Sequence, residues 1–396
     1  MTTPYLTKDI PGIGGQLKVE PADFFVEEIP LYIPSGQGQH VYLTLEKTGV
    51  TTHGAIKMIV QALNISPKAI GYAGLKDAQA VTRQLLSIDG VNPETVAALN
   101  LPKVKIVDVT RHRNKLKIGH LAGNRFVIRV RHVKPEAATV AQNILDVLSH
   151  KGVPNFFGEQ RFGNRANNHL LGEQIIRQNA SEFVAEFVGR PKAEELPPVQ
   201  AARHLVDEGQ WVEALKQWPH HLSEERRVIA AIVRAEGEPE VAFRALDKKL
   251  LNFFVSAFQS QLFNELLQQQ LDRLDQLETG DVAYIHQKGA AFLVEDATIE
   301  QPRADRFEIS PSGPLFGSKL LQAQGEPGLR EQKSLASREI ALDAFKMAGL
   351  KLSGSRRPYR FPLKEPKIWW DDGLVVSFEL PAGAYATTVL AEVMKN

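Results

Sequence analysis

Residues 71–84 read GYAGLKDAQAVTRQ, a glycine-flanked turn that follows the apolar Ile70 and places Lys76 beside Asp77. An aspartate at the end of a strand can be presented to a pocket, where its carboxylate acts as a nucleophile or a general base. A neighbouring ammonium group favours the ionised carboxylate. Spacing alone leaves a structural alternative open, in which Asp77 is a helix N-cap or a turn residue.

The composition is that of a globular protein with about two domains. The chain has 396 residues, of which 43% are hydrophobic and 23% charged, and a single core stops growing at roughly 250 to 300 residues. The absence of cysteine excludes disulfides, thiolate metal sites and a cysteine nucleophile, and it favours a reducing compartment. The N-terminal sequence lacks the features of a signal peptide, and no run of about 18 apolar residues could cross a bilayer. We therefore expect a cytoplasmic protein without membrane association.

Secondary-structure patterns change along the chain. The first 135 residues alternate as strands do near 16–29, 40–46, 103–118 and 125–133. Apolar residues at spacings of three and four predict helices over 52–64 and from Pro135 to Gly152. This first part is therefore expected to be mixed α/β.

A second, mainly helical unit is expected over about 165–275, where Ala, Glu, Gln, Leu and Arg dominate. Strand-like alternation returns over 279–310, and SPSGPLFG, residues 310–317, has the composition of a loop. Strand-rich sequence like that of the N-terminal third reappears in the last 36 residues. One unit is thus expected to interrupt the other.

A strongly basic segment ends the N-terminal third. Residues 101–134 hold ten Lys and Arg residues against the lone Asp108, a net charge of +9, whereas the whole chain carries only +1. The basic residues alternate with Val, Ile, Leu and Phe, which is typical of half-buried strands with one charged face. Such a face suits nucleic-acid phosphates, but charge also protects a solvated sheet edge. The pattern alone leaves both interpretations open.

GYAGLKDAQAVTRQ resembles the signature of the TruD family of tRNA pseudouridine synthases, in which Lys-Asp follows a glycine and any residue and precedes Ala, Thr and Gln at these offsets. Four other stretches support the resemblance, namely PADFFVEEI, LAGNRFVIRVR, NFFGEQRFGNR and LPAGAYATTVL. The similarity extends from about residue 16 to the C-terminus. NFFGEQRFG is too long and unusual to match by chance.

The resemblance implies a protein that contains both helices and strands, α/β in the broad sense and α+β in the strict sense. Residues 1–154 and 361–396 are expected to form a catalytic pseudouridine-synthase domain with a mixed, mostly antiparallel sheet. Residues 155–360 are expected to form an inserted, mainly helical α/β TRUD domain. The implied activity is that of an RNA-modifying isomerase, which converts a flipped-out uridine at position 13 of tRNA to pseudouridine without cofactor or metal. The implied partner is tRNA, with no obligate protein partner.

The resemblance also implies site residues. Asp77 matches the catalytic aspartate, which either adds to the base or captures positive charge at C1′; both routes remain open. Lys76 is expected as its electrostatic partner or as an RNA contact. A flipped base needs an aromatic surface on which to stack. The expected nucleotide contacts are Phe24, Asn124, Tyr385 and, as a second stacking residue, Phe126.

Each of these nucleotide contacts has a structural alternative. A strand Phe is usually a core side chain, and Asn124 after Gly123 also suits a turn. Tyr385 departs from relatives that have Phe at this place, but it keeps a ring face. The motif context favours the functional interpretation.

Basic residues supply candidate contacts to the RNA backbone. NFFGEQRFGNR is expected to join the two domains and to line the RNA cleft, while GSRRPYR forms a basic cluster near the predicted junction. Either a solvated loop or a phosphate site would account for that cluster. The candidates are Arg111, Arg113, Lys115, Lys117, Arg161 and Arg356.

Two other functions are consistent with the same residues. A non-catalytic RNA-binding or tRNA-remodelling protein would bind tRNA without modifying it, and a carboxylate-dependent glycosidase would release free uracil. Metal-dependent hydrolysis has little support, because the adjacent His220 and His221 lack the spacing by which a helix presents two ligands to one metal.

Overall fold

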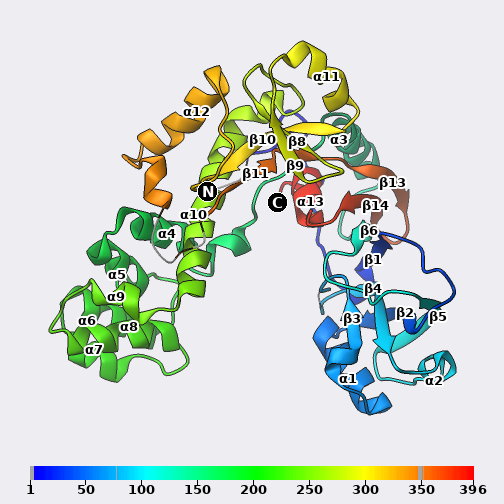
Figure 1. Cartoon of the computed structure of the whole chain (residues 1–396), viewed down its shortest axis with the longest axis horizontal. Helices are drawn as coiled ribbons and strands as arrows, with labels where there is room; N and C mark the ends of the chain where they lie inside the picture. The colour runs from blue at the N-terminus through cyan, green and yellow to red at the C-terminus, as the bar shows by residue number, and fades with distance from the viewer. Residues whose placement is uncertain (1–3, 77, 347–349, 351) are drawn as a thin grey trace. The chain divides into compact units, whose positions relative to one another are not determined.

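The computed structural model describes residues 4–76, 78–346, 350 and 352–396 (Figure 1). Asp77, the expected nucleophile, lies outside the described residues. The chain divides into two compact units. The first unit joins Met1–Pro154 to Phe361–Asn396, and the second unit comprises Asn155–Arg360.

An eight-stranded mixed sheet forms the centre of the first unit. Its strands are β1 (Phe24–Pro30), β2 (His40–Thr48), β3 (Ile70–Tyr72), β4 (Val81–Asp89), β5 (Val104–His112), β6 (Leu121–Val130), β13 (Lys364–Trp370) and β14 (Leu374–Pro381). They follow the order β13-β14-β6-β1-β4-β2-β5, and β3 pairs with β4. Within the described residues, β1 and β4 run parallel and the other pairs of this sheet are antiparallel. This confirms the expected mixed, mostly antiparallel sheet.

Helices flank the strands of the first unit. They are α1 (Thr52–Leu63), α2 (Pro93–Ala97), α3 (Ala137–Lys151) and α13 (Ala386–Met394), with the short 3₁₀ turns η1 (Pro21–Asp23) and η2 (Pro67–Ala69). The Thr51 hydroxyl caps α1 by accepting a hydrogen bond from the Gly54 N–H, and Gly152 caps the C-terminus of α3 with a φ of 92°, which favours glycine. The two helices expected from the apolar spacing are thus confirmed as α1 and α3.

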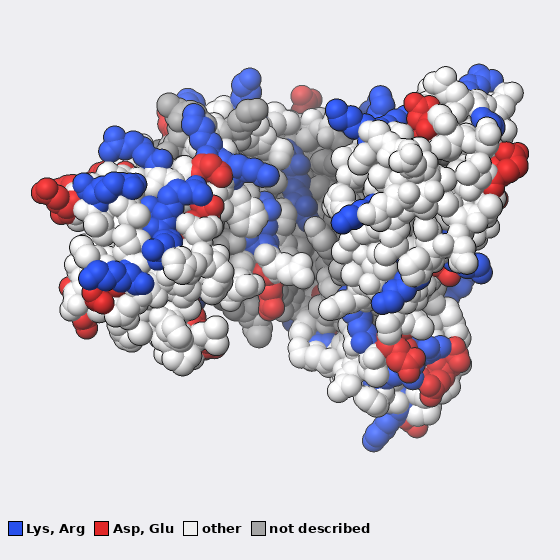
Figure 2. Space-filling model, turned by 90° about the horizontal axis from the view of Figure 1, so that it is seen from below, with Lys and Arg blue, Asp and Glu red and all other residues white. Residues whose placement is uncertain are grey.

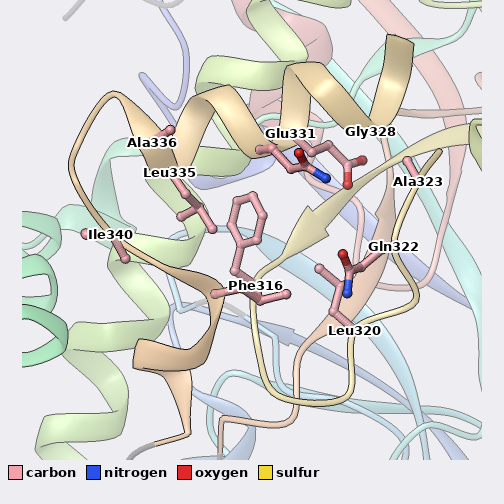
Figure 3. A pocket seen from close by; sticks show the side chains of 11 residues that line it. Phe316, Leu320, Gln322, Ala323, Gly328, Glu331, Leu335, Ala336 and Ile340 are labelled. Atoms are coloured by element: carbon pink, nitrogen blue, oxygen red, sulfur yellow. The ribbon is translucent and has the colours of Figure 1, made fainter. Parts of the chain in front are cut away.

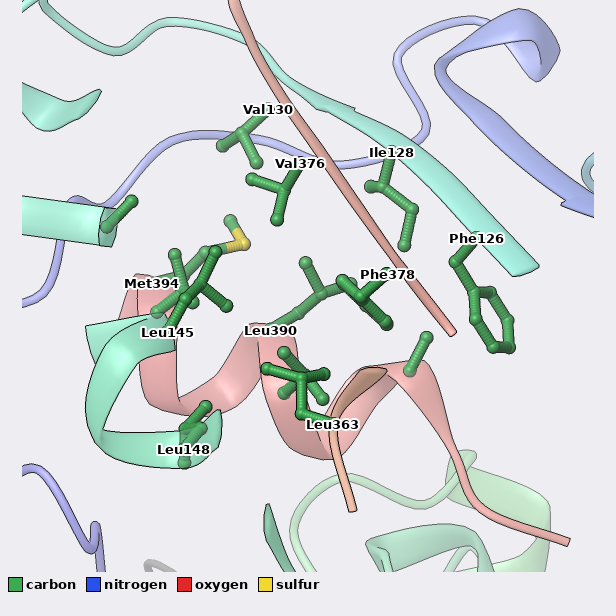
Figure 4. Packing of buried hydrophobic residues seen from close by; sticks show 14 of the residues in the cluster. Phe126, Ile128, Val130, Leu145, Leu148, Leu363, Val376, Phe378, Leu390 and Met394 are labelled. Atoms are coloured by element: carbon green, nitrogen blue, oxygen red, sulfur yellow. The ribbon is translucent and has the colours of Figure 1, made fainter. Parts of the chain in front are cut away.

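Two hydrophobic clusters cover one face of the sheet, which we call the inner face. In the first cluster, Phe126 and Ile128 of β6 and Phe378 of β14 pack with side chains of α3 and α13 (Figure 4). In the second, Ile56 of α1 packs with Leu43 of β2 and their neighbours. Full burial of such a side chain contributes about 1.5 to 3 kcal/mol. These clusters hold the helices on the sheet.

The second unit combines helices with a small sheet. Its helices are α4 (Asn168–Arg177), α5 (Ala180–Val188), α6 (Pro197–Asp207), α7 (Trp211–Gln217), α8 (Ser223–Arg234), α9 (Val241–Ala245), α10 (Lys248–Gln270), α11 (Ala297–Asp305) and α12 (Gly325–Ala336), with the 3₁₀ turns η3 (Glu159–Phe162), η4 (Leu271–Arg273) and η5 (Leu342–Phe345). Its strands are β8 (Val282–Ile285), β9 (Ala290–Leu293), β10 (Ile309–Leu315) and β11 (Ser355–Pro358), in the order β11-β10-β8-β9. The short strands β7 (Val153–Pro154) and β12 (Arg360–Phe361) lie at the unit boundaries.

The expected loop SPSGPLFG is instead largely strand β10. Residues 309–311 of β10 pair with β8, whereas residues 312–315 pair with β11. Proline lacks an N–H and interrupts a strand that is bonded along both edges, and this change of partner halfway along the strand accommodates Pro311 and Pro314. A side chain at Gly313 would meet the Tyr359 ring at 2.5 Å, so glycine permits the close approach. Composition alone was therefore misleading here.

Burial gives the second unit a pH-dependent stability. Burial raises the pKa of the Asp281 carboxyl to about 6, from 3.8 for an ordinary Asp. Because the folded state binds the Asp281 carboxyl proton more tightly than the unfolded state does, the protonated carboxyl stabilises the fold at acid pH. That contribution is lost as pH rises through about 6. We expect Asp281→Asn to raise the free energy of unfolding at pH 7.5 by on the order of 2 kcal/mol, and by less at pH 5.

Thermal unfolding at the two pH values measures this effect. The matched control is Asp343→Asn, because the Asp343 side chain is 80% exposed. It is expected to change the unfolding temperature equally at both pH values. The same pattern for Asp281→Asn would contradict the assignment.

Candidate active site

A polar strip crosses the inner face of the sheet between the two hydrophobic clusters. Glu28 of β1 lies opposite Asn124 of β6, and Lys47 of β2 lies opposite Thr82 of β4. These positions alternate with outward-facing residues, so they would otherwise hold apolar side chains. We define the polar strip as Glu28, Lys47, Thr52, Lys76, Thr82, Gln84 and Asn124.

A buried ion pair lies within the strip. The Lys76 Nζ is 2.9 Å from the Glu28 Oε1, and the two side chains are only 9% and 3% exposed. The other carboxylate oxygen, Oε2, accepts a hydrogen bond from the Leu85 N–H at 3.1 Å. Removing two charges from water is costly, so a buried pair is weak evidence for stability. Because Lys76 directly precedes Asp77 in the sequence, we interpret the ion pair as one that positions this segment of the chain.

The backbone of Lys76 is also held on both sides. Its N–H donates to the Thr52 Oγ1 at 2.9 Å, and the Thr52 hydroxyl donates to the Gln84 Oε1 at 2.9 Å. The buried Lys47 Nζ donates to the Val50 carbonyl at 2.6 Å and lies 3.4 Å from the Lys76 carbonyl oxygen. The residue directly before Asp77 is thus fixed at its side chain, its N–H and its carbonyl.

Several polar atoms of the strip are available to a ligand. The Thr82 Oγ1, the Gln84 Nε2 and the Asn124 Oδ1 are buried and have no hydrogen-bond partner in the part of the chain that the structure describes. A buried polar atom left unpaired costs about 1 to 3 kcal/mol. A bound pyrimidine, which carries donors and acceptors on its edge, is one way to satisfy such atoms.

The four candidate nucleotide contacts differ in accessibility. Phe24 and Phe126 are 8% and 7% exposed and meet edge to face, with ring centroids 6.4 Å apart. Phe126 also packs against Phe378, so both Phe rings lie within the core, and stacking by Phe126 stays a prediction. Tyr385, directly before α13, is 60% exposed. Of these aromatic side chains, Tyr385 presents the largest surface to solvent.

The residues of β5 and the following loop that are expected to contact the RNA backbone remain partly accessible. The Arg111 guanidinium donates to the Gly38 carbonyl at 3.1 Å, and the Lys115 ammonium donates to the Lys68 carbonyl. Arg113 and Lys117 are exposed and make no side-chain hydrogen bond or ion pair with the described residues. These two cations are therefore available to phosphates.

Three arginines of the basic segment, on and directly after β6, are paired with carboxylates of the first unit. Arg131 binds Asp23 and Asp372 at 2.8 Å each, and its hydrogen bonds lower the pKa of the Asp23 carboxyl. Arg129 pairs with Asp371 and Asp23, and Arg125 pairs with Glu379 and Glu27. Figure 2 draws one face of the chain, on which Lys and Arg side chains lie among Asp, Glu and uncharged residues. The net charge of +9 thus overstates the attraction of this segment for phosphates.

Arg356 requires correction as a backbone contact. Its guanidinium is buried and donates paired hydrogen bonds of 3.0 and 2.7 Å to the Glu331 carboxylate, while its Nε donates to the Ser312 Oγ at 3.2 Å. A phosphate would have to displace a buried carboxylate, which the desolvation cost opposes. Arg356 is therefore a structural cation of the second unit.

Arg161 holds the NFFGEQRFGNR segment on α10. Its guanidinium donates to the Ser256 Oγ at 2.8 Å and to the Ser260 Oγ at 3.1 Å, and it lies over the Phe157 ring. The side chain is half-buried. A phosphate contact by Arg161 stays a prediction.

The second unit contains a pocket of about 300 Å³ near α12 (Figure 3). Phe316, Leu320, Leu335 and Ile340 supply much of its apolar wall. Its carboxylate, Glu331, is already paired with Arg356. Among the described residues that line it, the pocket therefore offers no unpaired carboxylate.

Sequence reasoning missed five members of the strip, namely Glu28, Lys47, Thr52, Thr82 and Gln84. One signal was present in FFVEEI: alternation places Glu28 on the same face as Phe24 and Val26. A charged residue in an apolar position indicates a buried polar site. Lys47 and Thr52 carried no comparable local signal.

Metal ligation and membrane insertion have no support in the described residues. Among the described residues, no group of three or more His, Cys, Asp or Glu could hold a metal ion. No helix within the described ranges is long and apolar enough to cross a membrane.

Comparisons with known proteins agree along the whole chain. The sequence model of the family described as tRNA pseudouridine synthase D (TruD) matches residues 1–393. The tRNA pseudouridine synthase D of Syntrophotalea carbinolica is 47% identical over 394 residues, which cover 99% of this chain and 99% of that protein. The one from Geotalea daltonii is 45% identical over 395 residues, covering 99% and 100% of the two chains. A crystal structure described as TruD from Methanosarcina mazei has a TM-score of 0.89 and 29% identity, covering 99% of this chain and 96% of that chain. The chain therefore belongs to the TruD family of tRNA pseudouridine synthases.

Proposed function

We propose that this tRNA pseudouridine synthase uses the Asp77 carboxylate as a nucleophile on a uridine extruded from tRNA, at position 13 as the family resemblance implies. The first unit would be the catalytic domain and the second unit the inserted TRUD domain. The observation that carries the proposal is the buried Glu28–Lys76 ion pair, together with the backbone contacts that fix Lys76 directly before Asp77. The absence of cysteine suits a reducing compartment, and we propose the cytoplasm as the site of action.

The reaction rearranges bonds without oxidation or reduction. The bond between C1′ and N1 of uracil breaks, the base rotates while it is held, and C5 bonds to C1′. C5 then loses its proton, and N1 gains one. A carboxylate serves either as a nucleophile towards the base or as the group that captures C1′. The proposal holds for both routes.

The charges around residue 77 favour this role. The Lys76 ammonium is balanced by Glu28, and the Lys47 ammonium lies beside the carbonyl of the peptide group that joins Lys76 to Asp77. A positive charge in a poorly hydrated site favours the ionised form of a nearby carboxyl. Lys47 is therefore proposed as a cation that would favour an ionised Asp77 carboxyl.

The extruded base needs a surface and an edge contact. We assign stacking to the exposed Tyr385, with Phe24 bordering the polar strip, and the edge contact to Asn124, whose Oδ1 has no partner among the described residues. An acceptor oxygen suits the N3–H of uracil, and stacking on an aromatic ring is worth about 1 to 3 kcal/mol per base.

Mapping of modified nucleotides tests the function. Purified protein is incubated with unmodified tRNA transcripts, and the products are examined by mass spectrometry and by reverse transcription after carbodiimide treatment. We expect a single uridine to become pseudouridine without loss of mass. Release of free uracil, or intact tRNA binding without pseudouridine, would contradict the proposal.

Arg113 and Lys117 are expected to bind phosphates. Replacing both by Ala removes two cations, so tRNA affinity should fall about tenfold at low salt, and the dependence of log K on log salt should become shallower by about 1 to 2. Arg125→Ala is the matched control, because Arg125 is paired with Glu379. Fluorescence titration of labelled tRNA at several salt concentrations measures both quantities. An equal loss in the control would contradict the assignment.

A further inference from the structure

Three neighbouring loops of the first unit expose aliphatic side chains that the proposed chemistry does not use. They are residues 31–39 between β1 and β2, residues 73–76 after β3, and residues 113–120 between β5 and β6. We call them the loop rim. The exposed aliphatic side chains are Leu31 at 58%, Ile33 at 87%, Leu75 at 59% and Ile118 at 76%.

Hydrogen bonds and ring contacts join these loops into one surface. The Gly119 N–H donates to the Ala73 carbonyl at 2.9 Å, which links the second and third loops. The Tyr32 hydroxyl lies 2.9 Å from the His120 Nδ1, which links the first and third loops. The Tyr32 ring also stacks on His112 at the end of β5, with centroids 5.0 Å apart. The aliphatic side chains are therefore carried by connected loops rather than scattered over the surface.

The charges of the rim identify its partner class. Residues 113–120 carry Arg113, Lys115 and Lys117 but no Asp or Glu, and residues 31–39 contain no charged residue. The carboxylate of Asp89, at the end of β4, lies 3.7 Å from His40. Cations interspersed with exposed aliphatic groups suit a polyanion that also offers flat apolar surfaces. RNA with unstacked bases meets both conditions.

Leu75 connects the rim to the reaction. It stands two positions before Asp77 and directly before Lys76, whose backbone and side chain are fixed in the polar strip. Extruding a base from a paired stem costs a few kcal/mol of stacking and pairing. Apolar side chains inserted between bases offset such a cost in proteins that distort nucleic acids.

We propose that Leu75 and Ile118, supported by Leu31 and Ile33, contact the bases on either side of the target uridine and replace the stacking surface lost when it is extruded. This inference rests on the proposed function and deepens it. The rim thus lowers the cost of opening the stem, whereas Asp77 performs the chemistry.

The test compares two substrates. Leu75→Ser and Ile118→Ser are assayed for kcat/KM on native tRNA and on tRNA with a mismatch opposite the target uridine, which is already unpaired. On native tRNA we expect about a 10- to 100-fold loss, because a few kcal/mol of opening cost is no longer offset. On the mismatched tRNA the loss should be less than about threefold. Ile299→Ser, at a 69% exposed position of the second unit, is the matched control.

The outcomes separate this inference from the proposed function. A wild-type protein that makes no pseudouridine in either tRNA overturns the function itself. An active wild type with equal losses on both substrates overturns the inference, because the variants would then impair something other than stem opening. Variants that behave like Ile299→Ser also overturn it and would leave the rim to a protein partner. Thermal unfolding confirms that each variant is folded.

Discussion

Replacing Asp77 by Asn is expected to lower the single-turnover rate of pseudouridine formation by at least about 10⁴-fold. The amide of Asn has nearly the size of the carboxylate but carries no charge and is a poor nucleophile. Binding of tRNA should change by less than about threefold, because phosphate contacts such as those expected of Arg113 and Lys117 remain. Rapid-quench assays with excess enzyme measure the chemical step, and filter binding measures affinity.

The control for Asp77→Asn is Asp89→Asn. Asp89 is an exposed aspartate of the same unit, at the end of β4. Its loss should change the rate less than about threefold. An Asp77→Asn enzyme that retains a tenth or more of the wild-type rate would be incompatible with a nucleophilic role.

The second large effect is expected for Glu28→Gln. The amide can still accept the Leu85 N–H, but it leaves the buried Lys76 ammonium without its counter-ion. Breaking a buried pair at one partner costs about 3 to 5 kcal/mol. We expect Glu28→Gln to lower the free energy of unfolding by this amount. We also expect it to lower kcat by about 100-fold or more, since a small displacement at an active site has effects of this size.

A double variant separates positioning from stability. Glu28→Gln combined with Lys76→Met removes both charges, and replacing a buried ion pair by apolar groups is often neutral. The double variant should recover most of the unfolding free energy but not kcat. Denaturant unfolding and single-turnover assays give the two values. Recovery of kcat together with stability would show that the pair serves only the fold.

Local patterns in the sequence were sufficient for the main features of the fold. The alternation of apolar residues indicated the strands, and apolar spacing indicated α1 and α3. Both are local properties of the chain. β10 was missed because Ser, Pro and Gly suggest a loop, whereas burial of Ser310 and Ser312 depends on strands from other parts of the sequence.

Charge partners were not predictable in the same way. Arg131 lies 108 positions from Asp23 and 241 from Asp372, so the net charge of a sequence window could not reveal that it is neutralised. Arg356 was likewise predicted as a surface cation, because Glu331 approaches it only in the folded second unit. Glu28 shows the opposite case, since its inward position in β1 was visible in the sequence but its partner Lys76 was not.

The central claim is that the Asp77 carboxylate isomerises a uridine of tRNA. Its most direct test is single-turnover release of tritium from tRNA labelled at C5 of its uridines, with the modified site mapped in the same samples. Because isomerisation replaces the C5–H bond by a bond to C1′, we expect wild-type protein to release tritium in step with pseudouridine formation, and Asp77→Asn to release none. Tritium release by Asp77→Asn at the wild-type rate, with pseudouridine at the same site, would contradict the claim.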